Sequence, residues 1–110
     1  FYGKWNVDIP TTLALDPETA TLTDDARKRL EAVAQTWMKS IRYVFERDGK
    51  LTTRFAHVTA QYRFSIRKVD ERMVNLSIEK GGLSVPMTLT YKDKLLIIDD
   101  GNKPLALRRD

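Results

Sequence analysis

The side chains best suited to acid–base or metal chemistry are few in this sequence. His57 is the only histidine among the 110 residues, and there is no cysteine, so a zinc site would need carboxylates brought from elsewhere. A catalytic base also needs a nucleophile and an orienting partner nearby, and none of the serines lies in a nucleophile motif. We interpret His57 as a residue at the end of a strand.

The acidic residues have simpler explanations than catalysis or calcium binding. Residues 99–102 read Asp-Asp-Gly-Asn, but they lack the ligand spacing and closing glutamate of a calcium loop, so a turn between strands explains them. Asp24 and Asp25 follow Thr23, where an N-cap and negative charge stabilise the first turn of a helix. We therefore predict no catalytic residue, no metal site and no cofactor, and we expect that the protein is not an enzyme.

A set of aromatic and apolar residues has the composition of a small-ligand pocket. They share the inward side of their predicted strands, and tyrosine hydroxyls among them could orient a small apolar ligand. The alternative is a filled core, because an eight-stranded barrel is just wide enough for its own side chains or one small ligand. We therefore expect a cavity of at least roughly 300 Å³, about one drug-sized pocket, and a smaller cavity would contradict the ligand-binding expectation. The candidate ligand-binding residues are Trp5, Tyr43, Phe45, Phe55, Tyr62, Phe64, Met87 and Tyr91.

Strands must position these residues, because apolar and polar side chains alternate along most of the chain. Strict alternation indicates one buried and one solvated face, and turn residues separate the alternating runs. The predicted strands cover residues 3–8, 41–46, 51–56, 61–67, 74–79, 83–91, 94–99 and 104–109.

The turn at residues 47–49, Arg-Asp-Gly, predicts a three-residue hairpin loop with Gly49 in the left-handed conformation. This loop length sets Phe45 opposite Leu51, Tyr43 opposite Thr53 and Ile41 opposite Phe55, so that all six share one face. A two-residue loop would place Phe45 and Leu51 on opposite faces. In a later strand, Pro86 cannot donate to a ladder, so that strand is locally an edge or carries a bulge.

One amphipathic helix is predicted over about 24–40, between the first two strands. Thr23 is its N-cap, and an apolar stripe recurs at helical spacing. If this helix plugs the barrel, little room remains for a ligand. The whole chain, 1–110, is then one mainly β domain: an antiparallel up-and-down meander of about eight strands that forms a barrel. The stripe consists of Ala26, Leu30, Val33, Ala34, Trp37 and Ile41.

This arrangement resembles the lipocalin-like (calycin) barrels, especially the small domains of bacterial secreted proteins and lipoproteins. The matching features are Gly3-Lys4-Trp5 in the first strand, the helix before the second strand, and the hairpin at residues 45–49, Phe-Glu-Arg-Asp-Gly. The resemblance implies a late arginine packed over the tryptophan. Arg109 shares the inward side with Leu105 and Leu107, so we predict that it stacks on Trp5 and count it among the candidate ligand-binding residues.

The chain is mildly basic, with a net charge of +4. The exposed cations could form an anion or nucleic-acid surface, or simply a solvated barrel exterior. Single-strand binders interleave exposed aromatic residues with such charges, whereas the aromatic residues here point inward, so we do not expect nucleic-acid binding. No apolar run is long enough for a transmembrane helix. The residues of this candidate basic surface are Arg54, Arg63, Arg67, Lys68 and Arg72.

Two functions follow as expectations. The first is a non-enzymatic binding domain of the bacterial cell envelope, holding a small apolar ligand in the barrel. The alternative is a solid-core interaction or structural module that recruits a protein partner at the sheet edge near Pro86. The chain begins with Phe1 rather than methionine, as a processed or trimmed chain would, and a removed signal peptide would fit this start. The resemblance to bacterial secreted proteins and lipoproteins implies a periplasmic or secreted location, with a cytoplasmic one as the alternative.

Overall fold

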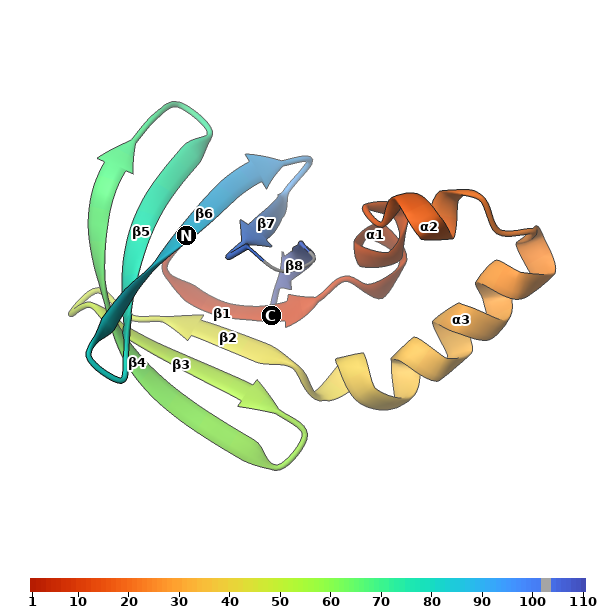
Figure 1. Ribbon diagram of the computed structural model, residues 1–110, viewed down its shortest axis with the longest axis horizontal. Coiled ribbons are helices and arrows are strands. Elements are labelled where there is room, and N and C mark those ends of the chain that lie inside the picture. Colours follow the sequence, from red (N-terminus) through yellow and green to blue (C-terminus); the bar gives the residue numbers. More distant parts are fainter. Residues whose placement is uncertain (102–103) are drawn as a thin grey trace.

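The alternating segments form eight strands that pair in sequence order and close into a barrel. The computed structural model describes residues 1–101 and 104–110, without the side chains of Ala20 and Trp37. Every pairing is antiparallel, and β1 also pairs with β8 to complete the ring (Figure 1). The predicted meander barrel is therefore confirmed. Its strands are β1 (Gly3–Val7), β2 (Arg42–Phe45), β3 (Lys50–Phe55), β4 (Val58–Val69), β5 (Met73–Lys80), β6 (Leu83–Lys92), β7 (Leu95–Asp99) and β8 (Leu105–Arg109).

The β2–β3 hairpin has the predicted register over most of its length. Phe45 pairs with Leu51 and Tyr43 with Thr53, and Gly49 has a φ of 88°. The ladder ends one pair earlier than predicted, at Arg42 and Arg54, because β2 begins at Arg42. The expected pairing of Ile41 with Phe55 is thus wrong.

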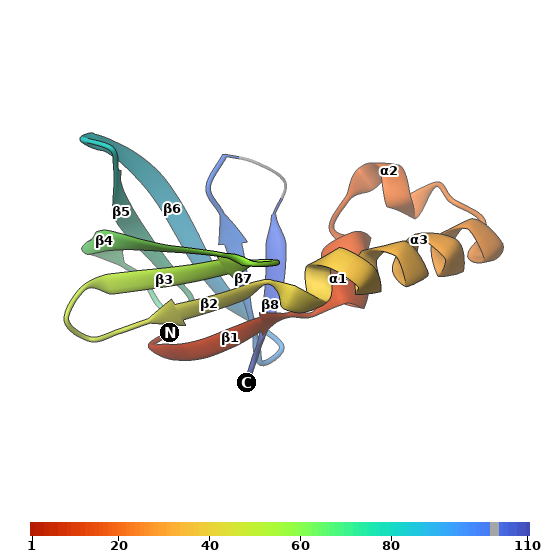
Figure 2. The same cartoon turned by 90° about the horizontal axis from the view of Figure 1, so that it is seen from below.

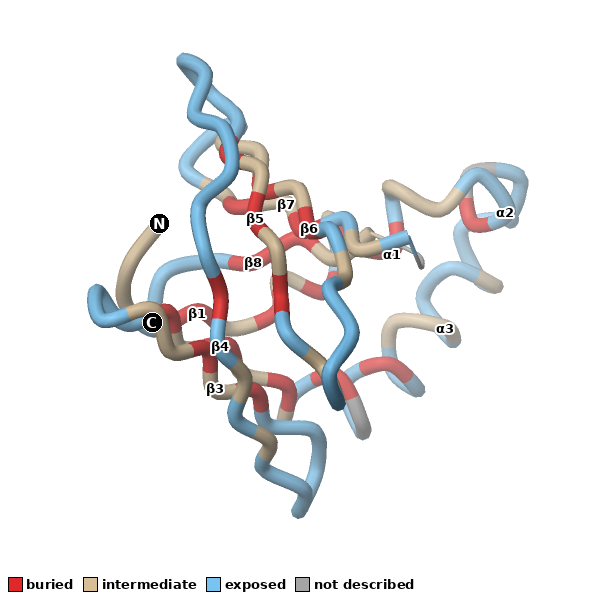
Figure 3. Tube along the Cα trace, turned by 60° about the vertical axis from the view of Figure 1, so that its left-hand side comes forward, coloured by how far each residue is buried: buried red, intermediate tan, exposed pale blue. Residues whose placement is uncertain are grey.

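Most of the core consists of inner-face side chains of the strands, joined by Ile9, Leu13, Ala34 and Met38 from the helical segments. Figure 3 marks the buried residues along the chain. Inner-face position does not guarantee burial where a strand extends past its neighbour. The β3–β4 ladder runs only from Lys50 and Arg63 to Phe55 and Val58, so the far half of β4 has no β3 partner and Ile66 is exposed. The largest fully buried side chains are Trp5, Phe45, Leu51, Leu76, Ile78, Leu89, Leu96 and Leu107.

Four helical segments connect β1 to β2, and they project from one end of the barrel without entering it (Figures 1 and 2). They are α1 (Ile9–Ala14), α2 (Pro17–Ala20), α3 (Asp24–Trp37) and the 3₁₀ turn η1 (Met38–Ser40). The predicted helix and its Thr23 N-cap are confirmed, since the Thr23 side chain accepts a hydrogen bond from Ala26 N–H.

Only part of the predicted apolar stripe of α3 is buried. Ala34 is buried and α3 contacts α1, but Val33 is 60% exposed. The Trp37 side chain lies outside the described residues. Because α3 packs on another helix rather than on the sheet, it does not plug the barrel.

The first half of β6 is a sheet edge, as predicted from the presence of Pro86. Residues 83–87 pair with β5, whereas the ladder to β7 begins at Thr88 and Asp99.

Among the described residues, no helix has the length and apolar character needed to cross a membrane.

Candidate functional site

A small pocket opens inside the barrel mouth, at the end that carries the β3–β4 and β5–β6 turns. We call it the cup. Its volume is about 230 Å³. Inner-face residues of five neighbouring strands and the first residue after β7 form it, and none of the helices contributes. The cup is lined by Tyr43, Leu51, Thr53, Phe55, Tyr62, Lys80, Met87 and Asp100.

The cup combines an apolar wall with hydroxyl groups and two opposite charges. Tyr43 is buried, and this burial, reinforced by the charge of Asp100 and by Tyr62, raises the pKa of the Tyr43 phenol to about 12. The phenol therefore stays protonated at neutral pH and can donate a hydrogen bond. The Lys80 ammonium lies 5.2 Å from the ring centre of Tyr62, within the range of a cation–π contact.

Exposed apolar side chains surround the cup at the barrel rim. Phe55 pairs with Val58, and Lys80 pairs with Leu83, so these partners lie on the same face as the cup. Phe55 is 44% exposed, Val58 68% and Leu83 71%. A ligand that protrudes from the cup would contact this rim. Phe55 is on the inner face as expected, but it lies at the rim rather than deep in the interior, because β2 begins at Arg42 and offers it no partner.

The structure divides the nine predicted ligand-binding residues between the two ends of the barrel. The cup brings together Tyr43, Phe55, Tyr62 and Met87. Whether these bind a ligand stays a prediction. The remaining five, which lie towards the opposite end, are Trp5, Phe45, Phe64, Tyr91 and Arg109.

That opposite end is packed rather than hollow. The Phe45 and Phe64 ring centres are 5.8 Å apart, and those of Trp5 and Tyr91 are 6.2 Å apart. The Arg109 guanidinium lies 4.3 Å from the Trp5 ring centre, so the predicted Trp5–Arg109 stack is confirmed. Trp5 Nε1 also donates to the carbonyl of Phe1 at 2.7 Å.

Four cup residues were missed by the sequence analysis: Leu51, Thr53, Lys80 and Asp100. The signal for the two charged residues was present, since Lys80 continues the inner-face series of Leu76 and Ile78 in β5, and Asp100 follows Ile98 in the same way. Asp100 was interpreted as part of a turn between strands, and the predicted strand 74–79 ends before Lys80. Leu51 and Thr53 had been placed on the inner face, but they carry no aromatic group.

The remaining candidate residues lie outside the cup. His57 is exposed in the β3–β4 turn, as predicted, and the five basic residues Arg54, Arg63, Arg67, Lys68 and Arg72 are exposed on the barrel surface. Within residues 1–101 and 104–110, no group of three or more histidine or carboxylate side chains is arranged to hold a metal ion. Asn102 of the predicted turn lies outside the described residues.

The fold and the cup define the chain as a closed eight-stranded antiparallel barrel with a small pocket at one mouth. No family model matches the chain, and neither a curated protein nor a solved structure matches it. The barrel and the Trp5–Arg109 contact are compatible with a lipocalin-like fold.

Proposed function

We propose that this chain is a non-enzymatic, lipocalin-like binding domain that holds a small ligand in the cup. The observation that carries the proposal is the difference between the two ends of the barrel interior. One end is filled with aromatic rings in edge-to-face contact, while the other contains a pocket of about 230 Å³ lined by Tyr43, Thr53 and Tyr62. Small-ligand sites typically combine such an apolar wall with a few placed polar groups.

The size of the cup limits the ligand. At about 230 Å³ the cup is smaller than the roughly 300 Å³ required of the expected pocket, so a drug-sized ligand is excluded and the proposal concerns a smaller molecule. The ligand that fits has a small apolar body and one polar end, which accepts a hydrogen bond from the Tyr43 phenol. Any further apolar part would rest on the rim at Phe55, Val58 and Leu83.

The proposal can be tested by NMR titration of the labelled protein with phenol, indole and hexanoate as probes. We expect at least one probe to shift signals of Tyr43 and Met87. Thr53→Leu fills the cup and should abolish these shifts, whereas Thr52→Leu, on the outer face of the same strand, should preserve them. Absence of shifts with all three probes, or binding that survives Thr53→Leu, would exclude the cup as the site.

The same proposal places the domain in the bacterial cell envelope, as part of a secreted protein or lipoprotein. Its support is the resemblance carried by Gly3, Trp5 and Arg109. Cell fractionation of the native protein tests the location, and recovery from the cytoplasm would contradict it.

A second candidate function is a protein-interaction module that uses the β6 edge. Residues 83–87 have no β7 partner, and Leu83 on this edge is 71% exposed, so a strand of another protein could add there. Light scattering over a range of concentrations, with Leu83→Lys as the variant, tests self-association. A monomer at every concentration that also captures no partner would count against this function.

A further inference from the structure

Four polar residues stand side by side across the outer wall of the barrel. The strand register pairs Arg108 with Asn6, Asn6 with Arg42, and Arg42 with Arg54. Residues directly opposite each other in a sheet have side chains on the same face. β8, β1, β2 and β3 therefore present three arginines and one asparagine as a continuous row.

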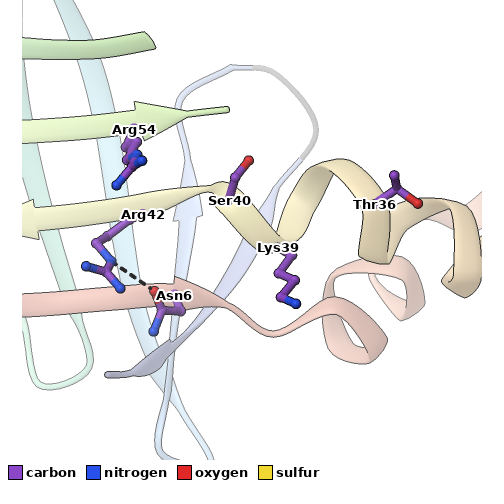
Figure 4. A pocket seen from close by; sticks show the side chains of 6 residues that line it. All are labelled: Asn6, Thr36, Lys39, Ser40, Arg42 and Arg54. Carbon is purple, nitrogen blue, oxygen red and sulfur yellow. Dashed lines mark hydrogen bonds between the residues drawn. The ribbon is translucent and has the colours of Figure 1, made fainter. Parts of the chain in front are cut away.

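Three residues of this row, Asn6, Arg42 and Arg54, line a groove next to η1 and the end of α3 (Figure 4). The groove has a volume of about 350 Å³, and its lining carries three cations and no carboxylate. A second depression of about 280 Å³ shares Asn6, Lys39 and Arg42 with it and adds Arg108 and Asp8. The lining of the larger groove is Asn6, Thr36, Lys39, Ser40, Arg42 and Arg54.

The register imposes charge repulsion that the described residues only partly neutralise. Like charges directly opposite each other destabilise a sheet, and Arg42 and Arg54 are such a pair. Arg42 has an ion pair with Asp110 at 3.6 Å. Over residues 1–101 and 104–110, Lys39, Arg54 and Arg108 form no ion pair. A bound anion would relieve the repulsion.

Asp110 shows that this row can hold an oxyanion. One oxygen of its carboxylate accepts a hydrogen bond from Asn6 Nδ2 at 3.0 Å, and the other lies 3.6 Å from Arg42 Nη2. The Asp110 side chain is 40% exposed. It therefore acts as an internal anion that an external one could displace.

We infer that this groove binds a phosphomonoester. A single carboxylate already occupies part of the row, so the additional cations Lys39 and Arg54 favour a ligand with more than one negative charge. Guanidinium groups match the geometry of phosphate oxygens. The groove is larger than a bare phosphate, which leaves room for a small organic group. Among the side chains that the structure describes, which do not include Trp37, its lining contains no aromatic residue on which a nucleobase could stack.

The test is calorimetric titration with glycerol 3-phosphate and with inorganic phosphate at constant ionic strength. We expect binding to the unmodified protein and at least tenfold weaker binding to Arg54→Gln and Lys39→Gln. Arg67→Gln removes an exposed arginine outside the groove and should bind normally. Asp110→Asn should bind several-fold more tightly, because the internal competitor is lost. Equal affinities of Arg54→Gln and Arg67→Gln would overturn the proposal.

Lipid vesicles distinguish the two sources of a phosphomonoester. If the phosphate belongs to a lipid headgroup, phosphatidylcholine vesicles containing phosphatidic acid should bind the protein, and Arg54→Gln should abolish this binding. If the ligand is soluble, glycerol 3-phosphate binds and the vesicles do not. Binding of a single-stranded oligonucleotide without binding of either phosphate probe would refute the proposal. Arg54→Gln removes a like-charge pair and should not lower the melting temperature, so lost binding would not reflect unfolding.

Discussion

Gly3 begins β1 where the side chain of Arg109 crosses that strand. Its φ is 118°, and a Cβ at this position would lie 2.6 Å from Arg109 Nη1. The same guanidinium stacks on Trp5 and donates a hydrogen bond to the carbonyl of Tyr2. Gly3 and Trp5 of the Gly3-Lys4-Trp5 motif therefore both contact Arg109.

We expect Gly3→Ala to lower the free energy of unfolding by about 1–3 kcal/mol, through backbone strain and displacement of the guanidinium. Urea unfolding measures the loss. Gly82→Ala is the control, because Gly82 also has a positive φ, of 84°, but no atom lies within 4 Å of its added Cβ. If Arg109 is the obstacle, Gly3→Ala should cost less in an Arg109→Ala background. Equal losses in both backgrounds would contradict this explanation.

The raised pKa of Tyr43 predicts that the free energy of unfolding decreases at alkaline pH. Burial raises its pKa from an ordinary value of about 10 to about 12. Between these values the unfolded chain loses the Tyr43 proton while the folded chain keeps it, so stability falls as pH rises. The contribution is complete below pH 10. Two pKa units at about 1.4 kcal/mol each give a loss on the order of 2–3 kcal/mol by pH 12.

Urea unfolding between pH 9 and pH 11.5 checks this loss, and Tyr43→Phe should make the curve shallower. Burial also raises the pKa of Tyr91, so part of the slope should persist in the variant. Tyr62→Phe serves as a comparison within the cup. A pH dependence unchanged by Tyr43→Phe would mean that Tyr43 ionises normally in the folded protein.

At the level of elements, a buried threonine hydrogen-bonds the helical segment to the barrel, in addition to the apolar contacts of Ile9, Leu13 and Met38. The buried Thr12 hydroxyl in α1 donates to the carbonyl of Ala106 at 3.2 Å and accepts from the N–H of Ala106 at 3.0 Å. It thus extends the pairing on the β1 side of β8, one position beyond the last β1–β8 pair of Val7 and Leu107. Asp8 N–H also donates to the Ala106 carbonyl, at 2.8 Å.

Replacing Thr12 with valine keeps the shape but leaves the Ala106 N–H buried without this partner. We expect a loss of about 1–3 kcal/mol in the free energy of unfolding. Thr12→Ser retains the hydroxyl and should lose less. Hydrogen exchange should show faster exchange at the Ala106 amide in the valine variant. Unchanged exchange there would show that another group satisfies the amide.

The strands could be predicted from the sequence because their side chains alternate with period two along each element. The position of the helices and the burial of their side chains depend on tertiary contacts, which the alternation pattern does not contain. Thr12 holds α1 through a bond 94 residues away in sequence, and no local signal contains that partner. Val33 fits the apolar stripe of α3, yet it is exposed, because the helix packs only on its own neighbours.

Across the whole molecule, the barrel interior differs between its two ends. The rings of Phe45 and Phe64, in edge-to-face contact, fill one end, and the cup opens at the other. The sequence predicted which residues face inward but not this division, because alternation specifies a face and not a height along the barrel. Lys80 and Asp100 illustrate the consequence: they sit on the inner face at the mouth, where water can still reach a charge.

The division of the interior predicts that stability and binding respond oppositely to filling the cup. Thr53 is 6% exposed and lines the cup, so Thr53→Leu would replace a hydroxyl with apolar atoms in vacant space. We expect the free energy of unfolding to rise by about 0.5–1.5 kcal/mol, while probe binding is lost. Thr52→Leu should change stability by less than about 0.5 kcal/mol. A Thr53→Leu variant that is less stable by more than about 1 kcal/mol would indicate overpacking, and therefore a mouth already as full as the opposite end.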